Sequence, residues 1–153
     1  MGVEERLKEL GIELPEPQAA LANYLPWVIT GNLVSVSGQV AMAGGNPRWV
    51  GKVGDKVSLE EAVEAARACA IQIIAHLQAA CEGDLERLRR IVRLGGFVNC
   101  IEGYTNQPKI INGASDLMVE VFGDRGRHSR AAVGTSSLPL NVPVEIDCLA
   151  EIA

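Results

Sequence analysis

The sequence predicts an α+β domain in which two helices cover one face of a mixed β-sheet. A long amphipathic helix near the middle of the chain is the clearest element, and short segments with the alternating pattern of strands lie on both sides of it. In order, the elements read β-β-β-α-β-α-β-β, which places helices and strands in two layers. The 153 residues, 48% of them hydrophobic, are enough for one domain with a buried core.

The first residues are predicted to form an addition to this domain. Residues 3–10 have the apolar spacing of a short helix that ends at the following glycine. The segment Leu14–Pro17 contains two prolines, which break regular structure and favour an extended linker. We therefore divide the chain into an N-terminal helix with a Pro-rich linker, residues 1–17, and a domain of residues 18–153.

A β-hairpin is predicted next. Residues 27–30 and 33–37 alternate as strands do, and Gly31-Asn32 between them is a two-residue turn. Gly38 lies at the end of the second strand, where a residue without a side chain lets backbone groups approach a ligand closely. Residues 48–53 are predicted to form a third strand.

Two helices and three further strands complete the domain. Ser58–Glu61 has the form of a capping box, and the apolar spacing after it predicts a helix that ends near Gly83. His76 on this helix is assigned no role, because a lone helical histidine is usually a surface or flanking residue. Residues 107–122 predict the second helix. The strands are predicted at residues 91–101, 129–135 and 142–152. In the first of them, Gly95-Gly96 indicates a bulge.

Composition argues against several classes of protein. The net charge of −5 and the pI of about 5.1 disfavour a nucleic-acid binder that works through a basic face. The four cysteines form no metal-binding pattern and are interpreted as reduced, mostly buried thiols of a cytoplasmic protein. The N-terminus lacks the form of a signal peptide, and no apolar run reaches the ~18 residues that a membrane span needs.

The two predicted helices leave one face of the sheet without a cover. The mean hydropathy of the chain is positive, at +0.15. A small domain of this kind commonly buries part of its apolar surface against other copies of itself. A symmetric oligomer that packs sheet against sheet is therefore the economical arrangement.

Arg130 is the most informative candidate residue. It lies near the start of the short apolar strand Ser129–Thr135, where a permanent cation has little use unless it meets an anion. Its guanidinium could hold a carboxylate through two parallel hydrogen bonds, or it could form an intersubunit or strand-edge salt bridge. The residues alone leave both interpretations open.

The other candidate residues carry weaker signals. Glu145 in the last strand could hold or activate a water, or it could simply face solvent, with Asp147 on the same strand face. Tyr24 could close over a small ligand, and Asn112 could add a donor or acceptor. Because phosphate-binding loops, nucleophile elbows and metalloprotease motifs are absent from the sequence, any activity rests on arginine, carboxylates, hydroxyls and backbone groups.

Three stretches of the chain resemble the RidA family, also called the YjgF or L-PSP family. They are Gly31–Gln39 (GNLVSVSGQ), Ser129–Val133 (SRAAV) and Pro143–Ala150 (PVEIDCLA). The motifs are quite specific in this order, and the resemblance extends from Tyr24 to Ala153. It implies a chorismate-mutase-like α+β fold and a homotrimer whose sheets form a central barrel, with clefts between subunits.

The resemblance also implies an activity. The active branch of the family hydrolyses small 2-imino acids to 2-oxo acids and ammonia, and it needs no cofactor or metal. By similarity, the catalytic candidates are Arg130, which would hold the substrate carboxylate, and Glu145, which would orient the attacking water. The substrate-binding candidates, which would contribute backbone groups or line the cleft, are Tyr24, Gly38, Asn112, Ser115 and Ala132.

The chain departs from the family pattern at two of these positions. Ala132 stands where the active branch often has cysteine, and Ser115 stands where an aromatic residue is common. The second change opens or polarises the predicted pocket. Two alternatives to a deaminase therefore remain. One is a trimeric module that binds a small carboxylate metabolite without turnover. The other is an endoribonuclease, which the acidic charge and the lack of a histidine pair for RNA cleavage disfavour.

Overall fold

The computed structural model of the protein describes residues 1–17 and 23–153. Residue 18, where the predicted domain starts, lies outside the described residues. The helices are α1 (Val3–Glu9), α2 (Leu59–Ala80) and α3 (Gln107–Phe122). The strands are β1 (Trp27–Thr30), β2 (Leu33–Val40), β3 (Met42–Ala43), β4 (Asn46–Pro47), β5 (Leu88–Asn99), β6 (Ser129–Thr135) and β7 (Val144–Ile152).

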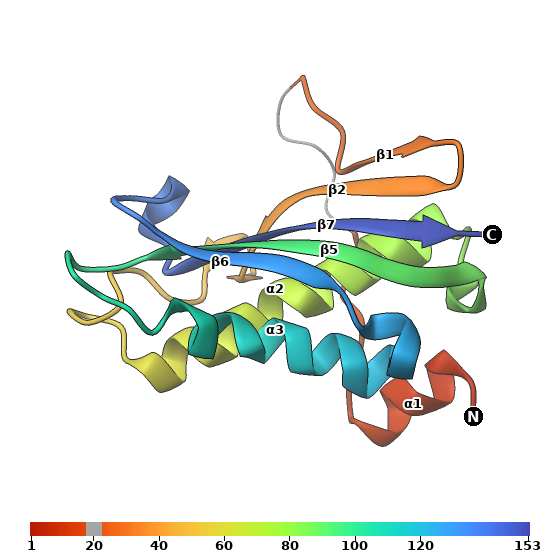
Figure 1. Ribbon diagram of the computed structural model, residues 1–153, viewed down its shortest axis with the longest axis horizontal. Helices are drawn as coiled ribbons and strands as arrows, with labels where there is room; N and C mark the ends of the chain where they lie inside the picture. Colours follow the sequence, from red (N-terminus) through yellow and green to blue (C-terminus); the bar gives the residue numbers. More distant parts are fainter. Residues whose placement is uncertain (18–22) are drawn as a thin grey trace.

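Five strands form one mixed sheet in the order β1-β2-β7-β5-β6. β5 and β6 run parallel, whereas the other neighbouring strands are antiparallel. α2 and α3 pack against each other on one face of this sheet (Figure 1). The predicted α+β class, with two helices on one face of a mixed sheet, is therefore confirmed.

α2 begins where the sequence predicts. The Ser58 hydroxyl accepts a hydrogen bond from the Glu61 backbone N–H at 3.1 Å, which satisfies one of the free donors at the helix start. The apolar face of the helix is fully buried against the sheet, with Ile73, Ile74 and Leu77 among its largest side chains. Each such side chain contributes ~1.5–3 kcal/mol through burial, so α2 is a main source of stability.

The glycine pair in β5 makes space rather than a bulge. β5 does have register shifts against β7, between Leu88 and Arg90 and between Ile91 and Arg93. The register is continuous through Gly95 and Gly96, so the bulge is wrongly placed at the glycine pair. A Cβ at Gly96 would lie 2.7 Å from Ile111 Cδ1 of α3, and a Cβ at Gly95 would collide with the Asp147 carboxylate on the other face. The missing side chains therefore let α3 approach one face and Asp147 lie flat on the other.

The predicted strand at residues 48–53 is also wrong. β3 and β4 form a minimal hairpin before it, and Val53 makes only single bridges, to Val57 and Cys100. Gly51 and Gly54 have φ values of +126° and +92°, a backbone region that side chains disfavour. These two turns interrupt the extended run that the apolar pattern indicated.

α1 packs on the rest of the protein. Val3 and Leu7 belong to the buried core, and Arg6 Nε donates a hydrogen bond to the Glu120 carbonyl oxygen of α3 at 2.8 Å. The Val3 N–H donates to Glu86 Oε1 at 2.6 Å. α1 covers most of the helix expected at residues 3–10, and it contacts α3 directly.

None of the helices in residues 1–17 and 23–153 covers the sheet face opposite α2 and α3, and we call it the open face. Residues paired across neighbouring strands point to the same side, so the strand register identifies its members. Val28 and Val133 on this face are 49% and 45% exposed. The open face includes Val28, Ser35, Arg93, Phe97, Val133, Glu145, Asp147 and Leu149. The prediction of a sheet face that the helices leave uncovered is confirmed for the chain on its own.

Candidate functional site

Arg130 lies on the helix side of β6, the edge strand next to α3. It is paired with Leu94, whose side chain is buried under the helices. Its NH1 donates a hydrogen bond to Ser115 Oγ at 3.0 Å, and its NH2 donates to the Pro108 carbonyl oxygen at 3.2 Å. Both partners belong to α3. The guanidinium is therefore held at the rim of the molecule while further N–H donors remain for an anion.

Ser115 is itself oriented by His128. His128 Nδ1 lies 2.6 Å from the Gly126 carbonyl oxygen, which can only accept, so Nδ1 carries a proton. Ser115 Oγ lies 2.9 Å from Nε2, and in the tautomer with its single proton on Nδ1 the hydroxyl donates this hydrogen bond. The lone pairs of Ser115 Oγ consequently face Arg130. A chain of three hydrogen bonds thus runs from Gly126 to the guanidinium.

Two further candidate residues lie beside Arg130. Ala132 follows it by two residues on β6 and is paired with Gly96, so both point toward the helix side. Asn112 is exposed on α3, one turn after Pro108 and one turn before Ser115. In the described part of the chain β6 pairs with β5 alone, so its outer backbone groups face away from the sheet. We call Asn112, Ser115, Arg130 and Ala132 the Arg130 rim.

Glu145 lies on the open face, beside Gly38. A bulge in β2 between Val36 and Gln39 places Gly38 against the Glu145 side chain. A Cβ at Gly38 would lie 2.8 Å from Glu145 Oε2, so the glycine leaves the room that the carboxylate occupies. Burial, and to a lesser extent the charge of Asp147, raises the pKa of Glu145 above its ordinary value. A carboxyl group of this kind is better suited to accept a proton near neutral pH.

A single chain does not bring all the predicted residues together. Arg130 and Glu145 point to opposite faces of the sheet. Tyr24, which is 51% exposed, precedes β1 at the sheet edge opposite β6. With strands spaced ~4.8 Å apart, the two edge strands are separated by on the order of 19 Å. The structure therefore shows two separate groups, the Arg130 rim and the pair of Gly38 and Glu145, with Tyr24 apart from both.

Sequence reasoning missed two histidines. His128, which directly precedes β6 and lies two residues before Arg130, is assigned no role from the sequence. His76 was expected to be a surface or flanking residue, but it is 1% exposed and lies 3.1 Å from Gln39 Oε1. A sequence signal for the burial of His76 was available in its spacing of four and eight residues from Gln72 and Ala68. This spacing places the three residues on one stripe of α2, separate from the stripe that packs on the sheet.

Within residues 1–17 and 23–153, no group of three or more His, Cys, Asp or Glu side chains is arranged to hold a metal ion. The four cysteines are all free thiols, and Cys100 alone among them is only partly buried. None of the helices in this part of the chain is long and apolar enough to cross a membrane.

Comparison with known proteins gives matches over nearly the whole chain. A protein-family model described as "YjgF/chorismate mutase-like, putative endoribonuclease" matches residues 4–152. The protein TCP17 of Trypanosoma cruzi is 42% identical over 151 residues, which are 98% of this chain and 94% of TCP17. Both matches include the segment of α1.

Solved structures share the fold. The protein Atu1372 of Agrobacterium tumefaciens, described as having unknown function, is 48% identical, with a TM-score of 0.92 over 99% of this chain and 92% of its own. TdcF of E. coli, solved with bound serine, is 18% identical, with a TM-score of 0.65 over 90% of this chain and 94% of its own. At that identity the likeness to TdcF shows the fold alone.

Proposed function

Because the chain belongs to the YjgF/chorismate mutase-like (L-PSP) family, we propose that it is a hydrolytic deaminase of small 2-imino acids, which it converts to 2-oxo acids and ammonia. The observation that carries the proposal is the placement of Arg130, which Ser115 and the Pro108 carbonyl hold at the rim of the sheet. Its remaining N–H donors suit a substrate carboxylate, bound through two parallel hydrogen bonds.

The proposed reaction is the addition of water to a C=N bond. The water oxygen attacks the imine carbon while the Glu145 carboxylate accepts one water proton, a role for which its raised pKa is suited. The proton then passes to the nitrogen of the tetrahedral adduct. The hydroxyl group of the adduct then gives its proton to the same nitrogen, again through the Glu145 carboxylate. The C–N bond breaks, ammonia leaves, and the C=O bond of the 2-oxo acid forms. Backbone groups near Gly38 and Ala132 hold the amine and the water.

This reaction requires more than one copy of the chain. Arg130 and Glu145 point to opposite faces of one sheet, so one small substrate can meet both only if they come from different copies. A homotrimer supplies such clefts, since a cyclic assembly joins two different surfaces of the chain. The β6 edge of one copy then lies near Tyr24 and Gly38 of the next, and the open faces are buried at the centre.

A small carboxylate ligand agrees with what is known of the fold. Serine, the molecule bound to TdcF, carries the kind of carboxylate that Arg130 would hold. The family description also names an endoribonuclease, but the net charge of −5 disfavours a nucleic-acid substrate. The alternative is a trimeric module that binds a small carboxylate metabolite without turnover. The Arg130 rim supports this alternative equally well, because both functions begin with the binding of a carboxylate.

The experiment is the release of ammonia and 2-oxo acid from 2-imino acids that a dehydratase generates in the assay. We expect the wild-type protein to accelerate release and Arg130→Ala to abolish the acceleration. Arg127→Ala is the matched control, because Arg127 pairs with Asp124 on the surface and is 70% exposed. No acceleration by the wild-type protein, together with thermal stabilisation by 2-oxo acids, would contradict the deaminase and favour the binding module.

A further inference from the structure

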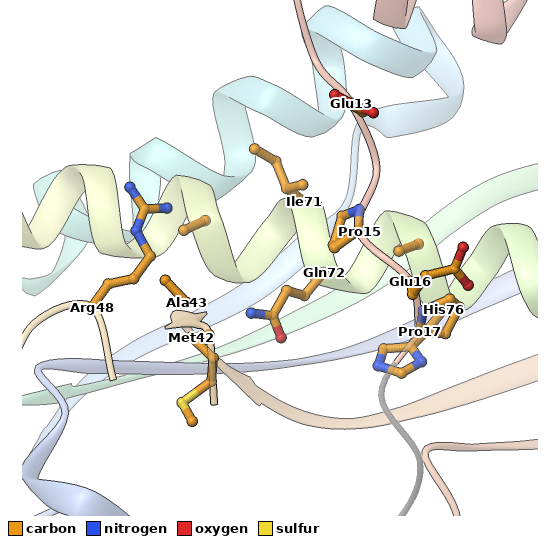
Figure 2. A pocket seen from close by; sticks show the side chains of 13 residues that line it. Glu13, Pro15, Glu16, Pro17, Met42, Ala43, Arg48, Ile71, Gln72 and His76 are labelled. Atoms are coloured by element: carbon orange, nitrogen blue, oxygen red, sulfur yellow. The ribbon is translucent and has the colours of Figure 1, made fainter. Parts of the chain in front are cut away.

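A cavity lies apart from the Arg130 rim and from Glu145. Its volume is about 440 Å³, and it is enclosed by α2, the β3–β4 hairpin and the linker Glu13–Pro17 (Figure 2). Its described lining contains neither the Arg130 rim nor Glu145. The floor is one stripe of α2, with the helical spacing of three and four residues. The members of this stripe are Ala68, Ile71, Gln72, Ala75 and His76.

His76 brings an unused acceptor to this cavity. The Gln39 amide nitrogen donates to the Ser37 carbonyl oxygen at 2.9 Å, so Gln39 Oε1 is the atom that faces His76, at 3.1 Å. An amide oxygen only accepts, and His76 Nε2 therefore carries the proton. Nδ1 is left with its lone pair. This atom is buried and has no hydrogen-bond partner in the described part of the chain.

The state of His76 defines what its partner must offer. Burial lowers the pKa of His76, so the ring stays neutral near pH 7 and Nδ1 stays an acceptor. A buried acceptor without a donor is unfavourable, and such atoms in native proteins usually have a partner. The group that completes this site is therefore an N–H or O–H donor. His76 lines the cavity but is only 1% exposed, so a donor reaches Nδ1 from the cavity as the neighbouring side chains move apart.

Charges of opposite sign lie at the two ends of the floor. Figure 2 shows Glu16 beside His76 at one end and Arg48 at the other, with Gln72 between them. The Arg48 guanidinium stacks 4.5 Å from the centre of the Trp49 ring and forms no ion pair within residues 1–17 and 23–153. The stripe extends from Ala68 to His76, eight helical steps that cover ~12 Å of helix. The cavity is thus long and bipolar.

We propose that this cavity binds a small zwitterion of the ω-amino acid class, whose ammonium group donates to His76 Nδ1 and whose carboxylate meets Arg48. Glu16 adds an opposite charge at the ammonium end. The alkyl chain lies along the apolar part of the floor, formed by Ile71 and Ala75. A single alanine or glycine molecule is too short to reach both ends, so the two charged groups must be separated by several carbons.

The test uses 6-aminohexanoate as the probe, with hexylamine and hexanoate as analogues that each lack one charged end. Titration calorimetry gives the affinities, and ¹⁵N NMR of the histidine rings reports directly on His76 Nδ1. We expect 6-aminohexanoate to shift that resonance and to bind more tightly than either analogue. Arg48→Ala is expected to weaken its binding about three- to tenfold and to leave hexylamine unaffected. Arg127→Ala, another exposed arginine, is the control.

The NMR readout needs no substitution of buried His76, so misfolding of a variant cannot hide the result. An Nδ1 resonance that no probe moves would overturn the proposal and indicate that water alone completes the site. Equal affinity for 6-aminohexanoate in the wild-type and Arg48→Ala proteins would also overturn it. The same titration on Arg130→Ala is expected to give the wild-type result, which keeps this test independent of the deaminase assay.

Discussion

Replacing Gly38 by alanine tests whether the Glu145 carboxylate must keep its position. The added Cβ would lie 2.8 Å from Glu145 Oε2 and 3.2 Å from its Cγ. Non-bonded atoms of this kind settle roughly 3.5 Å apart, so the carboxylate must move by on the order of 0.5–1 Å. The backbone at Gly38 is outside the left-handed region, and alanine therefore adds no backbone strain.

The expected effect falls on catalysis and spares the fold. A displacement of about 1 Å in a catalytic group can cost about 100-fold in rate, or ~2.7 kcal/mol in the activation barrier. Because the clash involves the flexible end of a side chain, we expect the free energy of unfolding to change by less than ~1 kcal/mol, which is about 2–4 °C in Tm. The assay measures kcat for 2-imino acid hydrolysis beside thermal unfolding. Ser35→Ala, also exposed on β2, is the control.

Two results would refute this reasoning. Full activity in Gly38→Ala would show that the Glu145 carboxylate does not need the place that the glycine leaves for it. A loss of more than about 10 °C in Tm would show that the carboxylate cannot move aside, and that Gly38 serves packing.

Three further predictions follow from the same contacts. Ser115→Ala removes the hydroxyl that accepts a hydrogen bond from Arg130 NH1. We expect steady-state kinetics to show KM raised about tenfold, or ~1.4 kcal/mol, with kcat nearly unchanged. An unchanged KM would show that the contact between Ser115 and Arg130 does not support substrate binding. Burial and the charge of Asp147 raise the pKa of Glu145 in the folded protein, so the folded state binds a proton on Glu145 more tightly than the unfolded chain does. The free energy of unfolding therefore falls as the pH rises from the ordinary glutamate range through the raised pKa. Urea unfolding across that pH range should show a shallower fall for Glu145→Gln, and identical slopes would contradict the assignment. Gly113→Ala would press a Cβ against the Val63 carbonyl oxygen where α3 crosses α2, which should cost ~1–3 kcal/mol and lower Tm by about 3–10 °C in calorimetry; an unchanged Tm would show that the two helices can separate.

Much of the fold could be predicted because its signals are local. The turn Gly31-Asn32 specifies the first hairpin, and the capping box at Ser58 specifies the start of α2. The strand expected at residues 48–53 was wrong because glycine conformation outweighed the apolar pattern. The bulge expected at Gly95-Gly96 was wrong because the space was needed by side chains from other elements, Ile111 and Asp147. Contacts of this kind cannot be read from a single segment.

The candidate site was predictable in its residues but not in its arrangement. The sequence singles out Arg130 as a cation in an apolar strand, yet its bonds to Ser115 and Pro108 depend on how α3 packs beside β6. The opposite faces of Arg130 and Glu145 follow from the register of β5 between β6 and β7, which no local pattern sets. The role of His128 depends on the same tertiary contact. The combined use of these residues, and the homotrimer itself, stay predictions.

The most direct test of the account is complementation between two inactive variants. Arg130→Ala and Glu145→Gln are each expected to be inactive, and subunits of the two are mixed in equal amounts and allowed to exchange. If every site takes Arg130 from one copy and Glu145 from the next, random mixing in a ring restores about one quarter of the sites. We therefore predict about a quarter of the wild-type rate of ammonia release. No recovery, with exchange verified by native mass spectrometry, would contradict a site shared between copies.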